Sequence, residues 1–162
     1  MLTVAALLLA ASMLVPLILG YQRYVITSGS MSGTYDRGSL IYDETVPTSS
    51  LKVGDIITYT PPAGHTRTER LTHRIYSIKV LNNGTRQYRT KGDANTAPDP
   101  WTFSLPNATQ ARVVFGIPYL GYIFALLSIP LVRILVLGIP ALLVALGAAG
   151  SLWQEAGQET KP

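Results

Sequence analysis

The sequence predicts a mainly β protein, in which an antiparallel β domain is flanked by N- and C-terminal transmembrane helices. Apolar residues make up 48% of the 162 residues and are concentrated at the two ends of the chain. The middle alternates runs rich in Val, Ile, Thr and Tyr with Gly, Pro, Asn and Asp, which is typical of short strands joined by turns. No stretch of the middle has the 3.6-residue period of a sizeable helix.

The first apolar segment carries no charge from Leu2 to Gly20 and consists mainly of Leu, Ala, Val and Met. Its length is about that needed to cross the hydrocarbon core of a membrane. A cleavable signal peptide is the alternative, but a basic n-region is missing and the apolar stretch exceeds the usual core of roughly 7–15 residues. We therefore expect residues 1–20 to form a transmembrane helix.

The second apolar segment, residues 119–153, contains an arginine, Arg133, between two prolines. A guanidinium at the centre of a bilayer costs at least ~2.5 kcal/mol, so Arg133 is expected at an interface. The second transmembrane helix is accordingly predicted over residues 131–153. Residues 119–130 are then expected along the membrane surface, and residues 154–162 as a disordered tail.

Between the two ends, residues 21–118 are predicted to form one antiparallel β domain. The Asn82–Gly84 stretch is a good hairpin turn, because Asn and Gly accept positive φ at little cost. The predicted strands are residues 24–27, 39–42, 55–59, 71–80, 87–90 and 111–115.

Composition and charge exclude several classes of function. The chain has no cysteine, which rules out disulfides and thiolate chemistry. The net charge of +4 comes from scattered basic residues, so no basic tract suggests nucleic acid. A domain held against anionic lipid headgroups and an ordinary solvated surface explain this charge equally well. No metal site and no cofactor are predicted.

A nucleophile is the first functional candidate, in the segment SGSMSG that follows the first span. A glycine between two hydroxyls allows a tight turn that presents Ser30 and aims backbone N–H groups at one point, as acyl transfer requires. A serine also needs a base, for which the candidates are His65, His73 and a desolvated lysine. His73 in an apolar strand is better held than His65 in a Pro-Gly loop, and Lys91 lacks the apolar setting that a lysine base requires. A plain loop and an exposed strand histidine are the structural alternatives.

A carboxylate to orient the base is the third candidate. Asp93 and Asp99 lie in a turn-rich segment after a predicted strand, where either could accept the imidazole N–H. An Asx-type turn is the structural alternative.

Taken in order, these segments resemble a type I signal peptidase of the archaeal and endoplasmic-reticulum kind, in which histidine replaces the lysine base of most bacterial enzymes. The resemblance runs from the first span to about Tyr122. It rests on five segments: 28–31 (SGSM), 52–57 (KVGDII), 72–75 (THRI), 90–99 (TKGDANTAPD) and 116–121 (GIPYLG). The family usually has a proline three residues after the nucleophile, whereas this chain has Gly33, which is expected to loosen the turn.

The resemblance implies a role for each matching residue. Ser30 would attack the scissile carbonyl, and His73 would take its proton and pass it to the leaving amine. Asp99 matches the acidic member of the triad, and Asp93 matches a second aspartate that supports the site. Ser28 matches a serine whose hydroxyl joins the Ser30 backbone N–H in the oxyanion hole.

The implied function is a membrane-bound serine endopeptidase that removes signal peptides from exported preproteins after small-x-small sites. Its partners would be those signal peptides and membrane lipid, with the translocation machinery as a further candidate. It would be a multi-pass protein of the cell membrane, with the catalytic domain on the extracytoplasmic side. Two alternatives stay open: a non-catalytic membrane-anchored β module that binds exported chains, and a dedicated processor of a few surface or pilin-like proteins.

Overall fold

The computed structural model describes residue 16 and residues 18–62, 70–139, 141–142, 145–147 and 149–150. The chain divides into two compact units, Met1–Tyr122 and Ile123–Pro162, and each is described by itself. His65 lies outside the described residues, as do most of the predicted first span, parts of the second and the predicted tail.

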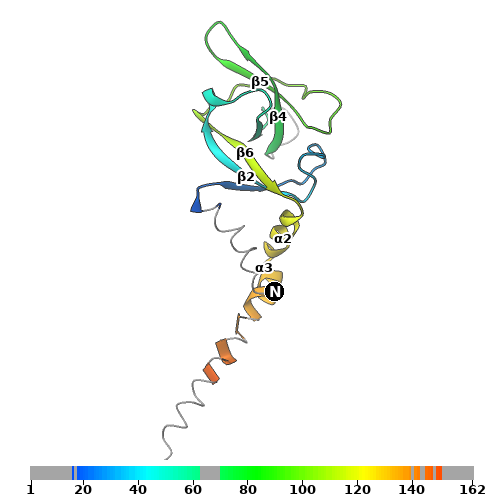
Figure 1. The fold of residues 1–162 in the computed structure, drawn as a ribbon, viewed down its shortest axis with the longest axis vertical. Helices are drawn as coiled ribbons and strands as arrows, with labels where there is room; N and C mark the ends of the chain where they lie inside the picture. The colour runs from blue at the N-terminus through cyan, green and yellow to red at the C-terminus, as the bar shows by residue number, and fades with distance from the viewer. Residues whose placement is uncertain are drawn as a thin grey trace, which may run out of the picture. The chain divides into compact units, whose positions relative to one another are not determined.

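The first unit is built on one antiparallel six-stranded sheet, which confirms the predicted mainly β fold. The strand order is β1-β2-β6-β3-β4-β5, and β2 and β6 run side by side in Figure 1. The strands are β1 (Gln22–Val25), β2 (Leu40–Pro47), β3 (Ile56–Tyr59), β4 (Leu71–Val80), β5 (Arg86–Lys91) and β6 (Thr109–Ile117). A single 3-10 turn, η1 (Thr48–Ser50), follows β2.

All six predicted strands are present, and β4 has the predicted bounds. β2 continues to Pro47, whereas the sequence predicted its end at Tyr42. Acidic residues are depleted in strands, which is why the segment after Tyr42 was not predicted as one. In the sheet, Glu44 lies directly opposite Arg112 of β6 and pairs with its guanidinium, so cross-strand charge complementarity compensates for the low propensity.

The predicted hairpin joins β4 to β5. Gly84 has a φ of 80°, and Thr85 N donates to Asn83 Oδ1 at 3.0 Å, as an Asx turn requires. The β4–β5 register shifts by one residue between Ile75 and Ser77, so β4 contains an irregularity just beyond its buried half.

The core of the first unit lies between β2, β3, β4 and β5. Tyr59 stacks on Phe103 with ring centroids 4.4 Å apart, which brings the segment after residue 100 against the sheet. The buried core residues are Val46, Leu51, Ile57, Tyr59, Leu71, Ile75 and Tyr88. Alternate positions of β4 enter this core, and this alternation decides which way the side chain of its histidine points.

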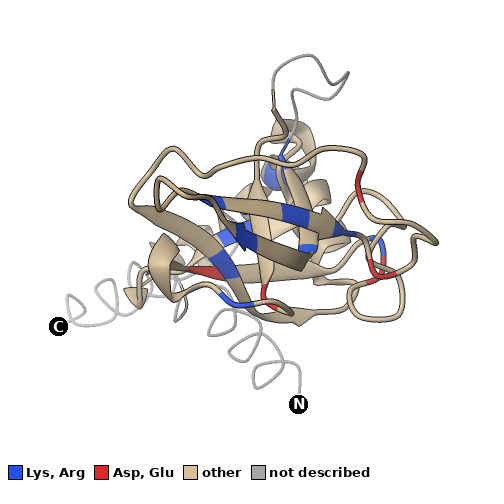
Figure 2. Cartoon of the chain, turned by 90° about the horizontal axis from the view of Figure 1, so that it is seen from above, with Lys and Arg blue, Asp and Glu red and all other residues tan. Residues whose placement is uncertain are grey.

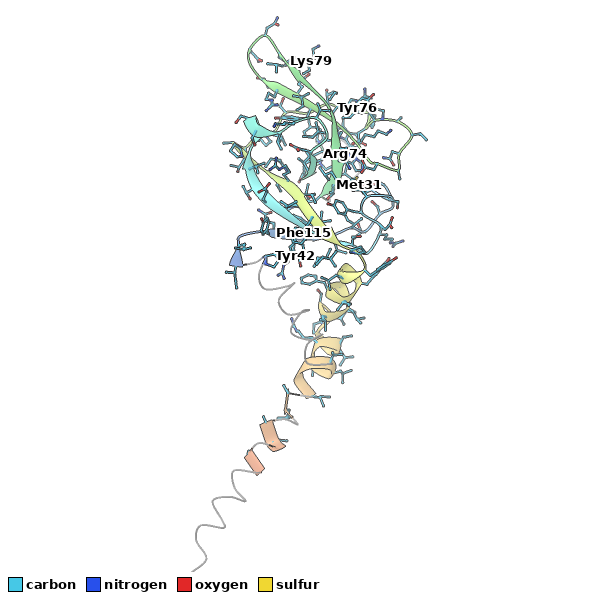
Figure 3. All side chains as sticks on the ribbon, in the orientation of Figure 1. Met31, Tyr42, Arg74, Tyr76, Lys79 and Phe115 are labelled. Atoms are coloured by element: carbon cyan, nitrogen blue, oxygen red, sulfur yellow. The ribbon has the colours of Figure 1, made fainter. Side chains whose placement is uncertain are left out.

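Tyr42 of β2, which is fully buried, stacks on the partly exposed Phe115 of β6 with centroids 4.7 Å apart, and the two lie next to each other in Figure 3. Lys and Arg residues are spread over several strands, as Figure 2 shows, and do not form one continuous stripe along the chain. The choice between a lipid-facing and an ordinary solvated basic surface stays open.

The chain leaves the sheet through Tyr119, which has a positive φ of 62°. The helical elements that follow are α2 (Leu120–Leu127), α3 (Pro130–Arg133) and the π-helical turn η2 (Ile134–Gly138). None of the helices in the described ranges is both long and apolar enough to span a bilayer. The two transmembrane helices and the membrane-surface segment therefore stay predictions.

Candidate active site

Ser30 is presented by a turn that follows β1. The turn is tied by backbone hydrogen bonds from Ser32 N to Gly29 O at 3.1 Å and from Thr34 N to Met31 O at 3.1 Å. Met31, next to the candidate nucleophile, is 1% exposed and anchors the turn in the interior. The Ser30 backbone is also held from the other side, because its carbonyl accepts a hydrogen bond from Ala94 N at 3.0 Å.

Gly33 closes the same turn with a φ of +95°. Proline cannot adopt this value, since its ring holds φ near −65°. The Gly33 N–H also donates to Asp36 Oδ1 at 3.2 Å, a bond that a proline would remove. The turn therefore uses a conformation that favours glycine over the family's usual proline, and the expected loosening by Gly33 stays a prediction.

His73 lies on β4, opposite Ile57 of β3, and points into the protein. Its side chain is buried, in line with Leu71 and Ile75 on the same face of the strand. The His73 Nε2 atom is 3.0 Å from Ser30 Oγ, which is hydrogen-bond distance. The alternative of an exposed strand histidine is thereby wrong.

Asp99 is the carboxylate in contact with His73. Its Oδ2 atom lies 2.7 Å from His73 Nδ1, and both side chains are almost completely buried. The Thr90 hydroxyl donates to the same oxygen at 2.5 Å. Burial alone would raise the pKa of the Asp99 carboxyl, but the hydrogen bonds from His73 and Thr90 outweigh it and hold that pKa below its ordinary value.

Two aromatic residues, Tyr59 and Trp101, extend the hydrogen-bonded cluster around this carboxylate. The Tyr59 hydroxyl lies 2.6 Å from Thr90 Oγ1, and the indole N–H of Trp101 donates to the Tyr59 hydroxyl at 3.2 Å. Burial raises the pKa of Tyr59 to about 12, so its phenol remains protonated and can act as a donor in this cluster. Thr90 is fully buried and directs its one proton to Asp99. The Asp99 carboxylate is thus held by His73 on one side and by the Thr90 hydroxyl on the other.

Asp93 belongs to a different cluster on the same loop. Its carboxylate accepts two hydrogen bonds from Arg74, at 2.9 Å from Nε and 2.6 Å from Nη2, and one from Thr34 Oγ1 at 2.6 Å. The bonds from Arg74 are the main cause that lowers the pKa of Asp93. This bidentate pair joins the loop after β5 to β4 and to the nucleophile turn, so Asp93 holds the site together without touching His73.

The loop approaches the site most closely at Gly92. A Cβ atom placed there would lie 2.5 Å from the Ser30 carbonyl oxygen and 3.0 Å from His73 Nε2. No real Cβ sits 2.5 Å from a backbone oxygen. The close approach of the loop after β5 to Ser30 and His73 therefore depends on a residue without a side chain at position 92.

The Ser28 hydroxyl lies beside the candidate nucleophile, 3.2 Å from Ser30 Oγ. The two hydroxyls face a small pocket of about 50 Å³ that includes Ile26, Met31 and Thr72 in its walls. An oxygen that develops a negative charge near Ser30 would find the Ser28 hydroxyl as a donor. Its part in an oxyanion hole stays a prediction.

The structure thus brings Ser28, Ser30, His73 and Asp99 together, whereas Asp93 pairs with Arg74, the residue after His73 on β4.

Sequence reasoning gave no role to Thr90, Tyr59 or Arg74. Arg74 and Thr90 lie in two of the segments that carry the family resemblance, 72–75 and 90–99, but only the sheet register and the return of the chain after residue 99 place these side chains at the site. An unbroken serine–histidine–aspartate hydrogen-bonded chain on a β domain is the arrangement of the serine protease class.

Comparison with known proteins points to one group within that class. No protein-family model matches the chain. Signal peptidase I W of Bacillus subtilis is 33% identical over 104 residues, which cover 64% of this chain and 52% of that protein. The human signal peptidase complex catalytic subunit SEC11C is 24% identical over 110 residues, covering 64% and 56%. The SEC11 subunit of Tuber melanosporum is 28% identical over 135 residues, covering 74% and 71%.

The curated homologues of this chain are therefore signal peptidases, and the family resemblance read from the sequence is confirmed. The chain spans about half the length of the first two relatives named above.

Proposed function

We propose that this chain is a membrane-anchored serine endopeptidase that removes signal peptides from exported preproteins. The observation that carries the proposal is the continuous contact from Ser30 Oγ through His73 to Asp99, at 3.0 and 2.7 Å. Such a chain supplies a nucleophile, a base and a group that orients the base. The relatives named as signal peptidases support the choice of substrate.

The reaction begins with proton transfer from Ser30 to His73. The Ser30 oxygen attacks the scissile carbonyl carbon while His73 Nε2 takes the hydroxyl proton. Asp99 accepts the Nδ1 hydrogen, which selects the tautomer with a free Nε2 lone pair and then stabilises the imidazolium. Because its lowered pKa keeps Asp99 ionised at neutral pH, that stabilisation is present where the enzyme works.

Collapse of the tetrahedral intermediate needs the same proton again. The carbonyl oxygen becomes negative and is stabilised by the Ser28 hydroxyl and the Ser30 backbone N–H. His73 then gives its proton to the leaving amine, which is the new N-terminus of the mature protein. Water attacks the acyl-enzyme with His73 as base once more, and releases the signal peptide from Ser30.

Selection of a small residue before the cleaved bond is supported by the pocket beside Ser30. Its volume of about 50 Å³ offers room for one or two water-sized groups, which suits a side chain no larger than Ala or Ser. The active domain faces the extracytoplasmic side and acts where membrane anchoring raises the effective concentration of enzyme and substrate.

The test compares the intact protein with Ser30→Ala in lipid vesicles, using a preprotein with an Ala-x-Ala site. We expect cleavage to fall by a factor of about 10⁴ or more in the variant. Ser32→Ala is the matched control, since Ser32 is an exposed serine of the same turn. Equal cleavage by the intact protein and Ser30→Ala would show that Ser30 is not the nucleophile.

The two alternatives give different results in the same assay. A non-catalytic binding module would hold the preprotein without cleaving it, and Ser30→Ala would bind equally well. A dedicated processor would cleave a few surface or pilin-like precursors and leave other Ala-x-Ala precursors intact. A panel of exported precursors separates these outcomes.

A further inference from the structure

Arg70, the residue directly before β4, lies at the boundary between two pockets. The small pocket beside Ser30 has Arg70, Leu71 and Thr72 in its wall. A much larger pocket of about 650 Å³ includes Arg70, Tyr24 and Thr58. Arg70 is the residue common to these two described pockets, so it lies where they meet.

Tyr24 holds the Arg70 side chain in this place. The guanidinium lies over the Tyr24 ring, 5.0 Å from the centroid, and its Nη1 atom donates a hydrogen bond to the Tyr24 hydroxyl. The Tyr24 hydroxyl in turn donates to Gln22 Oε1 at 2.5 Å. The hydrogen-bonded chain from Arg70 to Gln22 therefore fixes the direction of each donor along the rim of the large pocket.

The charge of Arg70 also acts on a buried carboxyl of β2. Asp43 of β2 is fully buried, and neither of its carboxylate oxygens has a hydrogen-bond partner. Burial raises the pKa of Asp43 to about 6, while Thr58 and the Arg70 charge act in the opposite direction. Thr58 acts on Asp43 from nearby without a hydrogen bond to it, and the Thr58 hydroxyl shares a hydrogen bond of 3.0 Å with the Thr72 hydroxyl. Arg70 supplies the one cation that acts on Asp43 in the described structure.

We propose that the Arg70–Tyr24 pair is a specificity-determining wall that closes the small pocket against the large one. This inference rests on the proposed function. With the wall in place, the residue before the cleaved bond has only the small pocket. Without it, a longer side chain would pass from the position beside Ser30 into the large pocket.

The test measures discrimination between Ala and Leu before the cleaved bond, with otherwise identical peptides. A hydrophobic pocket discriminates by roughly 10–200-fold per methylene, so the intact protein should prefer Ala by at least about 100-fold in kcat/KM. In Arg70→Ala that ratio should fall at least about tenfold, whatever the change in absolute rate. Tyr24→Ala should do the same from the other side of the wall, and Arg37→Ala, at an exposed arginine, should not change the ratio.

Arg70→Lys tests whether the flat guanidinium or only its charge matters. A lysine keeps the charge but loses the planar stacking and the forked donors, so it should lose discrimination as Arg70→Ala does. Discrimination equal to that of the intact protein in Arg70→Lys would overturn the wall, and so would an unchanged ratio in Arg70→Ala.

A binding measurement separates failure of the wall from failure of the proposed function. Fluorescently labelled Ala and Leu peptides are titrated with Ser30→Ala and with the double variant Ser30→Ala, Arg70→Ala. Removal of Arg70 should raise the affinity for the Leu peptide relative to the Ala peptide at least about tenfold. If this change is seen but the intact protein cleaves nothing, only the proposed function is refuted. Equal Ala-to-Leu affinity ratios in the two variants would overturn the wall.

Discussion

Replacing Asp43 by asparagine should remove a loss of stability that the intact protein suffers as the pH rises from 4 to above 6. The free energy of unfolding of the variant, relative to that of the intact protein, should therefore increase with pH. The carboxyl is fully buried, and its pKa is about 6 in the folded protein against an ordinary value of 3.8. A raised pKa means that the folded state binds the Asp43 proton more tightly than the unfolded state. Stability is therefore lost as the pH rises from about 4 through 6.

The size of the loss follows from the shift. A carboxyl raised from 3.8 to about 6 costs the folded state about 3 kcal/mol once the pH is well above 6. Two tyrosines that act on Asp43, Tyr24 and Tyr35, do not titrate in this window, because burial raises the pKa of both above the ordinary value. The asparagine amide brings its own burial cost, but that cost does not change with pH.

The assay is urea unfolding of the full chain in detergent micelles, followed by near-ultraviolet circular dichroism at several pH values between 4 and 8. The free energy of unfolding of Asp43→Asn minus that of the intact protein should increase by about 2.5 kcal/mol over this range, since part of the loss has already occurred at pH 4. Asp36→Asn, at an exposed aspartate, is the control for removal of one negative charge. A difference that stays constant within about 0.5 kcal/mol from pH 4 to 8 would refute the reasoning.

Three further predictions concern the site. Gly92→Ala should lower cleavage at least about 100-fold in a protein whose circular dichroism stays native, because its Cβ would lie 2.5 Å from the Ser30 carbonyl oxygen; wild-type rates would contradict the close approach. Thr90→Val removes a donor to Asp99 worth about 1.5–3 kcal/mol, so kcat should fall roughly tenfold or more with little change in KM, and Thr90→Ser should restore it. Gly33→Pro should lower the free energy of unfolding by at least about 1 kcal/mol in urea titrations, because φ is +95° there and the bond to Asp36 is lost; greater stability would mean that the turn adopts another conformation.

The fold class could be predicted from the sequence because strands have local signals. The Val, Ile, Thr and Tyr runs and the Asn-Gly turn mark the strands and the β4–β5 hairpin, and β4 was predicted with its observed bounds. The second half of β2 was missed, since the pair between Glu44 and Arg112 joins residues 68 positions apart. A pattern within a short window cannot report such a pair.

The sequence by itself determined which residues are candidates for chemistry, because hydroxyl, imidazole and carboxylate groups in turns and strands can be read one position at a time. Only the tertiary structure decided which aspartate contacts His73. Asp93 and Asp99 lie six residues apart on the same loop, and the choice depends on the distances from His73 to each carboxylate and on the competing Arg74. The tertiary structure likewise revealed the buried Asp43 and the contact between Arg70 and Tyr24, since burial and long-range contacts arise only when distant strands pack together.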